Sequence, residues 1–171
     1  VTERKNPKII IESLETIDGN VSLEIIGQTP NLKYLKELNE LISSSKHAEN
    51  ITMTPFIKAE ELISKYSSAN LFILPSKSEG LGRVIIEAQS TACPVLVSSN
   101  TGMVDLIIEN ETGYIFENNN KNDLSNKIQH IMNNYESALQ TGLNSKDFVK
   151  ENQSVANFEF GYKKLIDLVS T

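Results

Sequence analysis

Apolar residues recur along the chain with two different spacings, and the two spacings alternate. Stripes three or four positions apart predict amphipathic helices, and short continuous apolar runs predict buried strands. The stripes predict helices at residues 7–18, 30–45, 59–67, 83–91, 123–134, 135–148 and 156–169. The runs predict strands at residues 21–26, 51–53, 71–74, 94–98 and 114–116, and a short helical segment is expected at 104–108. Helices and strands therefore alternate over most of the chain.

This alternation is typical of a parallel sheet that helices cover on both faces. The sequence predicts an α/β fold with a Rossmann-like, doubly wound parallel sheet in a three-layer α/β/α arrangement. Ligands of such sheets bind beyond the carboxyl ends of the strands. The turns expected at that edge follow Ile26, Met53, Leu74 and Ser98.

The first predicted element is a helix, which Asn6 is expected to cap and which Pro7 suits at its first position. In a doubly wound sheet the first strand is usually central. Two alternatives stay open: a strand lies upstream of Val1, or the sheet closes without it. The chain also lacks an initiator Met, so it is expected to be a fragment of a longer protein.

Composition narrows the classes of function. The 171 residues suit one domain, and 16 basic against 22 acidic residues give a net charge of −6. General attraction to nucleic acid or to anionic membranes is therefore not expected. The single cysteine, Cys93, excludes an internal disulfide, is expected to pack in the core, and suits a cytoplasmic setting. No apolar run approaches the length of a membrane span.

The most informative stretch is residues 75–88, where a glycine turn joins a predicted strand to a predicted helix. The unpaired N–H groups at the start of such a helix favour an anion. Glu79 and Glu87 bracket the turn with seven residues between them. Because carboxylates repel phosphate, each is expected to accept hydrogen bonds from hydroxyl groups, one from a sugar and the other from a ribose diol.

Positive charge for a diphosphate must be local. The chain has two arginines, Arg4 and Arg83, and Arg83 lies in the glycine turn. The two arginines, together with Lys5 and Lys77, are candidates to neutralise a diphosphate. No Asp-x-Asp and no cluster with metal-ligand spacing occurs, so neither a metal nor another cofactor is expected.

These residues also carry a resemblance. The run from Ser78 to Gly82, followed by Glu87 and Ala88, resembles the E-G-F-G-x-x-x-x-E-A signature of family 4 retaining nucleotide-sugar glycosyltransferases, which have the two-domain GT-B architecture. Residues 4–131 resemble the family's C-terminal, donor-binding domain in order. The similar blocks are residues 4–6, 24–27, 68–76, 94–98, 102–105 and 113–116.

The resemblance implies roles for individual residues. It implies that Glu79 is the catalytic-site acid and contacts the transferred sugar, that Lys5 binds the donor diphosphate, and that Glu87 holds the ribose. The other donor-binding residues expected are Gly80, Leu81 and Gly82 through their backbone, Ile57 at the nucleobase edge, and Arg83 at the phosphates.

Four positions depart from the family pattern. Leu81 replaces an aromatic residue, Pro55 stands where glycine is common, Ala92 replaces a glycine, and Asp105 replaces a glutamate. The resemblance also implies that the family's first strand and its acceptor-binding domain precede Val1. Residues 1–171 would then be one half of a GT-B enzyme.

The expected function is the transfer of a hexose from a UDP- or GDP-linked sugar to a glycan or lipid-linked acceptor, as in bacterial polysaccharide biosynthesis. The fragment alone is expected to be inactive, and the full-length enzyme to associate peripherally with a membrane. Two alternatives stay open. One is a nucleotide-sugar epimerase of the same architecture, and the other is a non-catalytic nucleotide-binding α/β domain.

Overall fold

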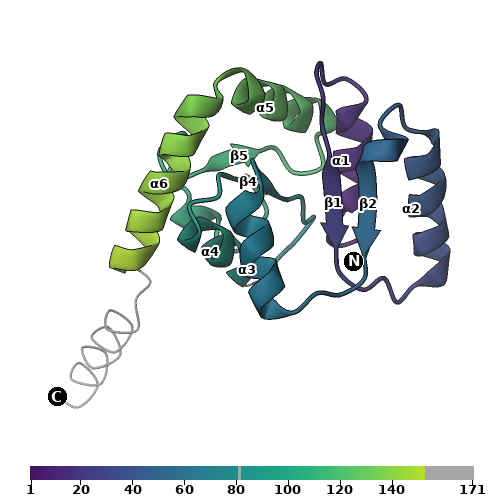
Figure 1. Cartoon of the computed structure of the whole chain (residues 1–171), viewed down its shortest axis with the longest axis horizontal. Helices are drawn as coiled ribbons and strands as arrows, with labels where there is room; N and C mark the ends of the chain where they lie inside the picture. Colours follow the sequence, from purple (N-terminus) through teal and green to yellow (C-terminus); the bar gives the residue numbers. More distant parts are fainter. Residues whose placement is uncertain (81, 153–171) are drawn as a thin grey trace, which may run out of the picture.

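A computed structural model describes residues 1–80 and 82–152 (Figure 1). Its helices are α1 (Pro7–Leu14), α2 (Leu32–Ser44), α3 (Ala59–Ser68), α4 (Arg83–Ser90), α5 (Lys121–Asn133) and α6 (Tyr135–Asn152). Its strands are β1 (Leu23–Ile26), β2 (Ile51–Thr54), β3 (Phe72–Leu74), β4 (Val95–Ser98) and β5 (Tyr114–Phe116). Two short 3-10 turns, η1 (Ala48–Asn50) and η2 (Val104–Leu106), complete the described elements.

All pairings between the named strands are parallel, as the sequence predicts. β1 pairs with β2 in one sheet, and β3, β4 and β5 pair in that order in a second sheet. Among the described residues β1 and β3 are not hydrogen-bonded to each other. Closure of the sheet without a further strand, one of the two alternatives above, is therefore not seen among the described residues. The other alternative, a strand upstream of Val1, stays a prediction.

The helices form two layers because the second sheet, β3–β4–β5, is apolar on both faces. Leu96 of β4 lies in one apolar core with residues of α1, α2 and α5. Its neighbours Val95 and Val97 lie in a second core with residues of α3 and α4. Successive strand residues point to opposite faces, so one short strand supplies both cores. The result is a three-layer arrangement.

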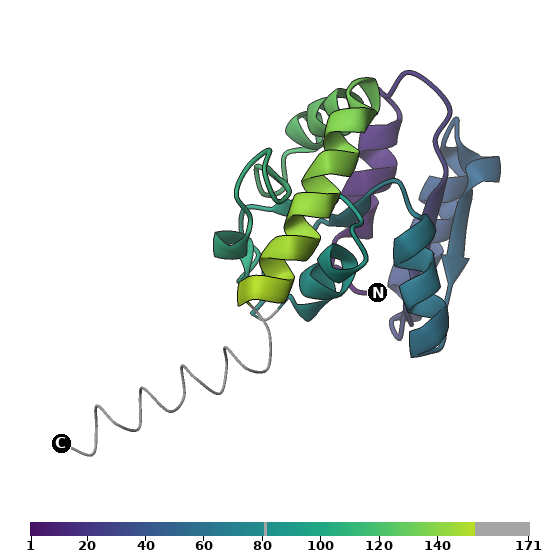
Figure 2. The same ribbon diagram turned by 60° about the vertical axis from the view of Figure 1, so that its left-hand side comes forward.

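Helix α6 is fixed against the turn between α4 and β4 (Figure 2). A Cβ on Gly142 of α6 would lie 2.2 Å from the carbonyl oxygen of Ala92, so the two backbones touch there. Ala92 itself has a φ of 63°. The glycine that the family pattern has at position 92 suits that conformation, whereas an alanine must be held in it.

Several predicted boundaries are displaced. The first helix ends at Leu14 and not at residue 18, although Ile17 is buried. Beyond Leu14 the backbone hydrogen bonds join residues three apart, from Thr16 to Ser13 and from Ile17 to Leu14, and not residues four apart as in an α-helix. Helix α6 extends to Asn152, past the predicted end at 148. The predicted helix 156–169 lies outside the described residues.

The start of α1 corrects one prediction. Pro7 occupies the first helical position as expected, but Asn6 does not cap the helix with its side chain. Asn6 has a left-handed backbone with a φ of 51°, and its amide group donates to Asn119 Oδ1 at 3.5 Å. The side chain thus joins two distant segments of the chain.

Cys93 packs as predicted. It is 2% exposed and belongs to the core between β3, β4 and α4. Burial raises the pKa of its thiol to about 11. The thiol is therefore protonated at neutral pH.

Candidate functional site

The glycine turn at residues 75–82 connects the end of β3 to the start of α4. Pro75 and Ser76 are buried, and they fix the point at which the chain leaves the sheet. The backbone of Glu79 then pairs with that of Thr101, and Gly102 N donates to Glu79 O at 2.7 Å. The turn is thus held against the segment that follows β4, at the carboxyl edge of the second sheet.

Gly102 is essential to this packing. A Cβ at this position would lie 2.0 Å from Gly80 O and 2.6 Å from Glu79 O, which real atoms do not tolerate. The resemblance includes Gly102 in a similar block, but it assigned the residue no role. A functional search limited to polar side chains misses it, because its contribution is the absence of a side chain.

The two predicted donor-binding glycines differ. A Cβ on Gly80 would have nothing within 4 Å, so the turn is open at that point. Gly82 is buried, and a Cβ there would contact Ile85, Thr101 and Leu74 at 3.1–3.4 Å. Gly82 is also the N-cap of α4 and supplies no capping side chain. No side chain therefore caps the first N–H groups of α4, and anion binding there stays a prediction.

Glu79 lies among cations. Its Oε2 accepts a hydrogen bond from Lys5 Nζ and another from Ser76 Oγ at 3.3 Å, and Arg4 Nη1 lies 3.4 Å from its Oε1. Its side chain is 9% exposed. Partial burial by itself raises the pKa of Glu79, but the hydrogen bond and charge of Lys5, with Arg4, hold it below its ordinary value. Glu79 is therefore ionised at neutral pH.

Arg4 also contacts the backbone of the turn. Lys77 N donates to Arg4 O at 2.8 Å, and Arg4 Nη1 donates to Ser78 O at 2.8 Å. The structure thus brings Lys5 and Glu79, which are 74 residues apart, to one place. Lys77, by contrast, takes part through its backbone.

Glu87 and Arg83 stand on α4 beyond the turn, and both are exposed. Glu87 faces Tyr66 of α3, and burial, then the charge and hydrogen bonding of Glu87, raises the pKa of the tyrosine hydroxyl. Tyr66 therefore stays protonated and can donate to that carboxylate. Arg83 forms no salt bridge within residues 1–80 and 82–152, so it is not drawn into the Glu79 cluster.

The predicted nucleobase segment follows β2. Ile57 is half-buried, whereas the side chain of Phe56 is 71% exposed. Gly27 N donates to Thr54 O at 2.9 Å, so the turns after β1 and β2 lie side by side at one edge. Leu81 lies outside the described residues.

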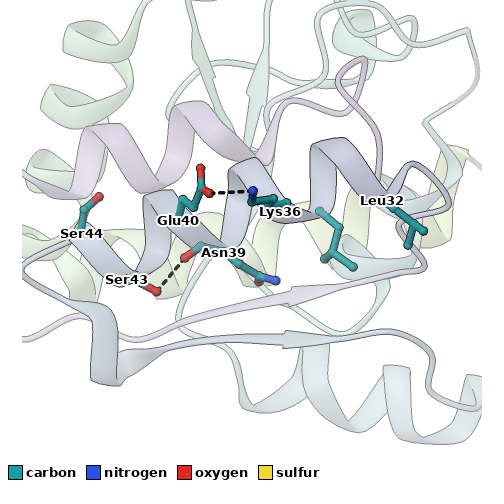
Figure 3. A pocket seen from close by; sticks show the side chains of 7 residues that line it. Leu32, Lys36, Asn39, Glu40, Ser43 and Ser44 are labelled. Carbon is teal, nitrogen blue, oxygen red and sulfur yellow. Dashed lines mark hydrogen bonds and ion pairs between the residues drawn. The ribbon is translucent and has the colours of Figure 1, made fainter.

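The described surface also has hollows away from the glycine turn, one of them between α1, α2 and the start of α5. A shallow hollow follows α2, and its lining residues all belong to that helix (Figure 3). They are Leu32, Leu35, Lys36, Asn39, Glu40, Ser43 and Ser44. Polar groups there bond along the helix, as Lys36 does with Glu40 at 3.7 Å, and none comes from a second element. Within the described part of the chain no three His, Cys, Asp or Glu side chains could hold a metal ion.

The chain matches the family described as Glycosyl transferases group 1 over residues 1–148. It belongs to this family. It is also 30% identical over 149 residues to an uncharacterized glycosyltransferase of Methanocaldococcus jannaschii. The aligned residues cover 86% of this chain and 40% of that relative. The capsular polysaccharide biosynthesis glycosyltransferase CapM of Staphylococcus aureus is 31% identical over 114 residues, or 67% of this chain and 29% of CapM.

Solved structures support the fold of this group 1 glycosyl transferase chain. The Anabaena protein HepE superposes with a TM-score of 0.88 at 19% identity, over 100% of this chain and 46% of HepE. The predicted family and the Rossmann-like, GT-B type fold are confirmed. The chain spans less than half the length of each of these three proteins. None of the described helices is both long and apolar enough to cross a membrane.

Proposed function

We propose that residues 1–171 are the C-terminal, donor-binding domain of a retaining glycosyltransferase of the GT-B type. The full-length protein would transfer a hexose from a UDP- or GDP-linked sugar to a glycan or lipid-linked acceptor, in the cytoplasm or at its membrane surface. This chain alone would bind the donor and transfer nothing. The observation that carries the proposal is the Lys5–Glu79 pair, held at the open glycine turn before α4 in a chain of this family.

The charges support separate roles along an elongated donor. Lys5 and Arg4, which both contact Glu79, would neutralise a diphosphate that the first N–H groups of α4 also bind. Glu79 would exchange its bond with Lys5 for hydroxyl groups of the sugar. Stabilising the negative charge of the departing diphosphate would supply much of the catalysis.

The other contacts to the donor would come from α4, from the segment after β2 and from the glycine turn. Glu87, one eight-residue step beyond Glu79, would bind the ribose diol with help from Tyr66. Backbone groups around Ile57 would meet the nucleobase. The open space at Gly80 would let the sugar and phosphates approach the backbone. HepE has been crystallised in complex with UDP and glucose, which favours UDP as the first nucleotide to test.

Isothermal titration of the chain with UDP and with GDP tests the proposal. We expect one of them to bind, with the complex unchanged by a chelator, since no metal is proposed. A folded sample that binds neither nucleotide would contradict donor binding. Product analysis on the full-length protein then distinguishes transfer from epimerisation: a glycosylated acceptor supports the proposal, and an epimerised free donor overturns it.

A further inference from the structure

Residues 117–120, the loop between β5 and α5, contact both the glycine turn and the segment that carries Lys5. The sequence predicts a strand that ends at residue 116 and a helix that begins at residue 123, and it gives the residues between them no role. In the structure Asn118 contacts the glycine turn, and Asn119 contacts the segment that carries Lys5. One loop therefore touches the chain on either side of the Lys5–Glu79 pair.

A buried side chain of β4 fixes the orientation of the Asn118 side-chain amide. Ser98, at the buried end of β4, donates its hydroxyl to Asn118 Oδ1 at 3.0 Å, and Ser99 Oγ accepts from the Asn118 backbone at 3.1 Å. With Oδ1 occupied in this way, Nδ2 is directed outward, where it donates to Lys77 O at 3.4 Å. A chain of hydrogen bonds thus runs from β4 to the glycine turn.

Lys77 is a suitable point at which to hold the turn. Its carbonyl also accepts from Asn100 Nδ2 at 3.4 Å, and its N–H donates to Arg4 O. Glu79 is two residues further on. A shift of the Lys77 peptide would therefore move Glu79 relative to Lys5.

The next residue of the loop, Asn119, contacts Asn6. Asn119, with a φ of 60°, accepts from Asn6 Nδ2 at 3.5 Å. Asn6 is 6% exposed, has a left-handed backbone, and directly follows Lys5. This contact explains why Asn6 does not cap α1.

We propose that Asn118 is a positioning residue for the donor site, which fixes the Lys77 peptide and thereby the separation of Glu79 from Lys5. The proposal rests on the function proposed above insofar as the site binds a nucleotide. Among the described residues Asn118 makes no hydrogen bond to Glu79 or Lys5, and it acts through the Lys77 carbonyl.

The test compares Asn118→Ala with Asn122→Ala, an exposed asparagine four residues away whose side chain has no hydrogen bond among those of the described chain. We expect Asn118→Ala to weaken nucleoside diphosphate binding about tenfold and Asn122→Ala to leave it unchanged. Combined with Lys5→Ala, Asn118→Ala should have no further effect, because the pair it positions is already gone. Full additivity in this cycle would overturn the proposal, since a general loss of stability adds to any other change.

A second measurement needs no nucleotide. NMR titration of the Glu79 carboxyl should show its pKa rising toward the ordinary value in Asn118→Ala, as Lys5 and Arg4 draw away, and unchanged in Asn122→Ala. Ser98→Ala, which removes the hydroxyl that donates to Asn118 Oδ1, should act in the same direction. An unaltered Glu79 titration in both variants would overturn the inference. If the wild-type chain binds neither UDP nor GDP, the proposed function fails while this titration still decides the role of Asn118.

Discussion

The two sides of the glycine turn differ in how closely they are packed. On one side the carbonyl groups of Glu79 and Gly80 lie so near Gly102 that a single added carbon would overlap them. On the other side, at Gly80, an added carbon would meet nothing within 4 Å. The turn is closely packed on the side of Gly102 and open on the side of Gly80. Its backbone groups can therefore bind a ligand without a rearrangement of the turn. Glycines needed for packing are thus distinct from glycines that leave room.

Gly102→Ala should cause the largest loss, because it acts on the closely packed side of the turn. The new Cβ would have to displace backbone atoms, so we expect a loss of about 3 kcal/mol in the free energy of unfolding. Urea denaturation monitored by circular dichroism measures it. A variant as stable as the wild type would show that the turn is not fixed on this side.

Lys5→Ala tests whether the charge beside the turn serves the ligand. We expect nucleoside diphosphate binding to weaken by about thirtyfold, the equivalent of one lost charge-assisted hydrogen bond of about 2 kcal/mol. Lys8→Ala is the matched control, because Lys8 is exposed and pairs only with Glu12, at 3.8 Å, among the described residues. Equal losses in the two variants, measured by calorimetry, would argue against a phosphate contact at Lys5.

Gly80→Ala tests the open side. The position has room for a methyl group and no left-handed φ, so stability should stay within about 0.5 kcal/mol of the wild type. Donor binding should nevertheless weaken about tenfold, because the methyl group would occupy space that the sugar or phosphates need. Unchanged affinity for both UDP and UDP-glucose would mean that the ligand does not approach Gly80.

The pH dependence of stability should show the smallest effect. The pKa of Glu79 is lowered in the folded chain, so its contribution is fully present above the ordinary value of 4.5 and is lost as the pH falls through the folded value. In Glu79→Gln we expect the drop in unfolding free energy between neutral and acidic pH to be smaller by about 1 kcal/mol. The effect is modest because solvent partly screens the ion pairs of Glu79 with Lys5 and Arg4. Identical profiles of unfolding free energy against pH for both proteins would contradict the ion pairs at Glu79.

The sequence predicts the fold well because each β–α unit is encoded locally. The apolar run before Pro75, the glycines and the stripe on α4 are neighbours in the chain, so their spacing predicts a strand, a turn and a helix. The predicted extent of the first helix is wrong, because the apolar stripe reports burial and Ile17 is buried beyond the helix end. Periodicity does not distinguish a buried helix residue from a buried loop residue.

Contacts between distant segments could not be predicted in this way. The resemblance assigned Lys5 and Glu79 to one ligand, and the structure adds that they bond to each other. Nothing in the local pattern indicated that Asn6 would turn from its helix toward Asn119, or that Gly102 would lie beneath Gly80. Each depends on the packing of backbone segments that only the folded chain brings together.

The burial of Cys93 has a practical consequence. It is the single thiol in the chain, and it lies in the core that carries β3, β4 and α4, the elements from which the glycine turn projects. A thiol reagent can reach it only when that core opens, so the labelling rate measures how often the core opens. A nucleotide that binds at the start of α4 should therefore slow the labelling, which gives a measure of binding through chemistry that takes place away from the ligand.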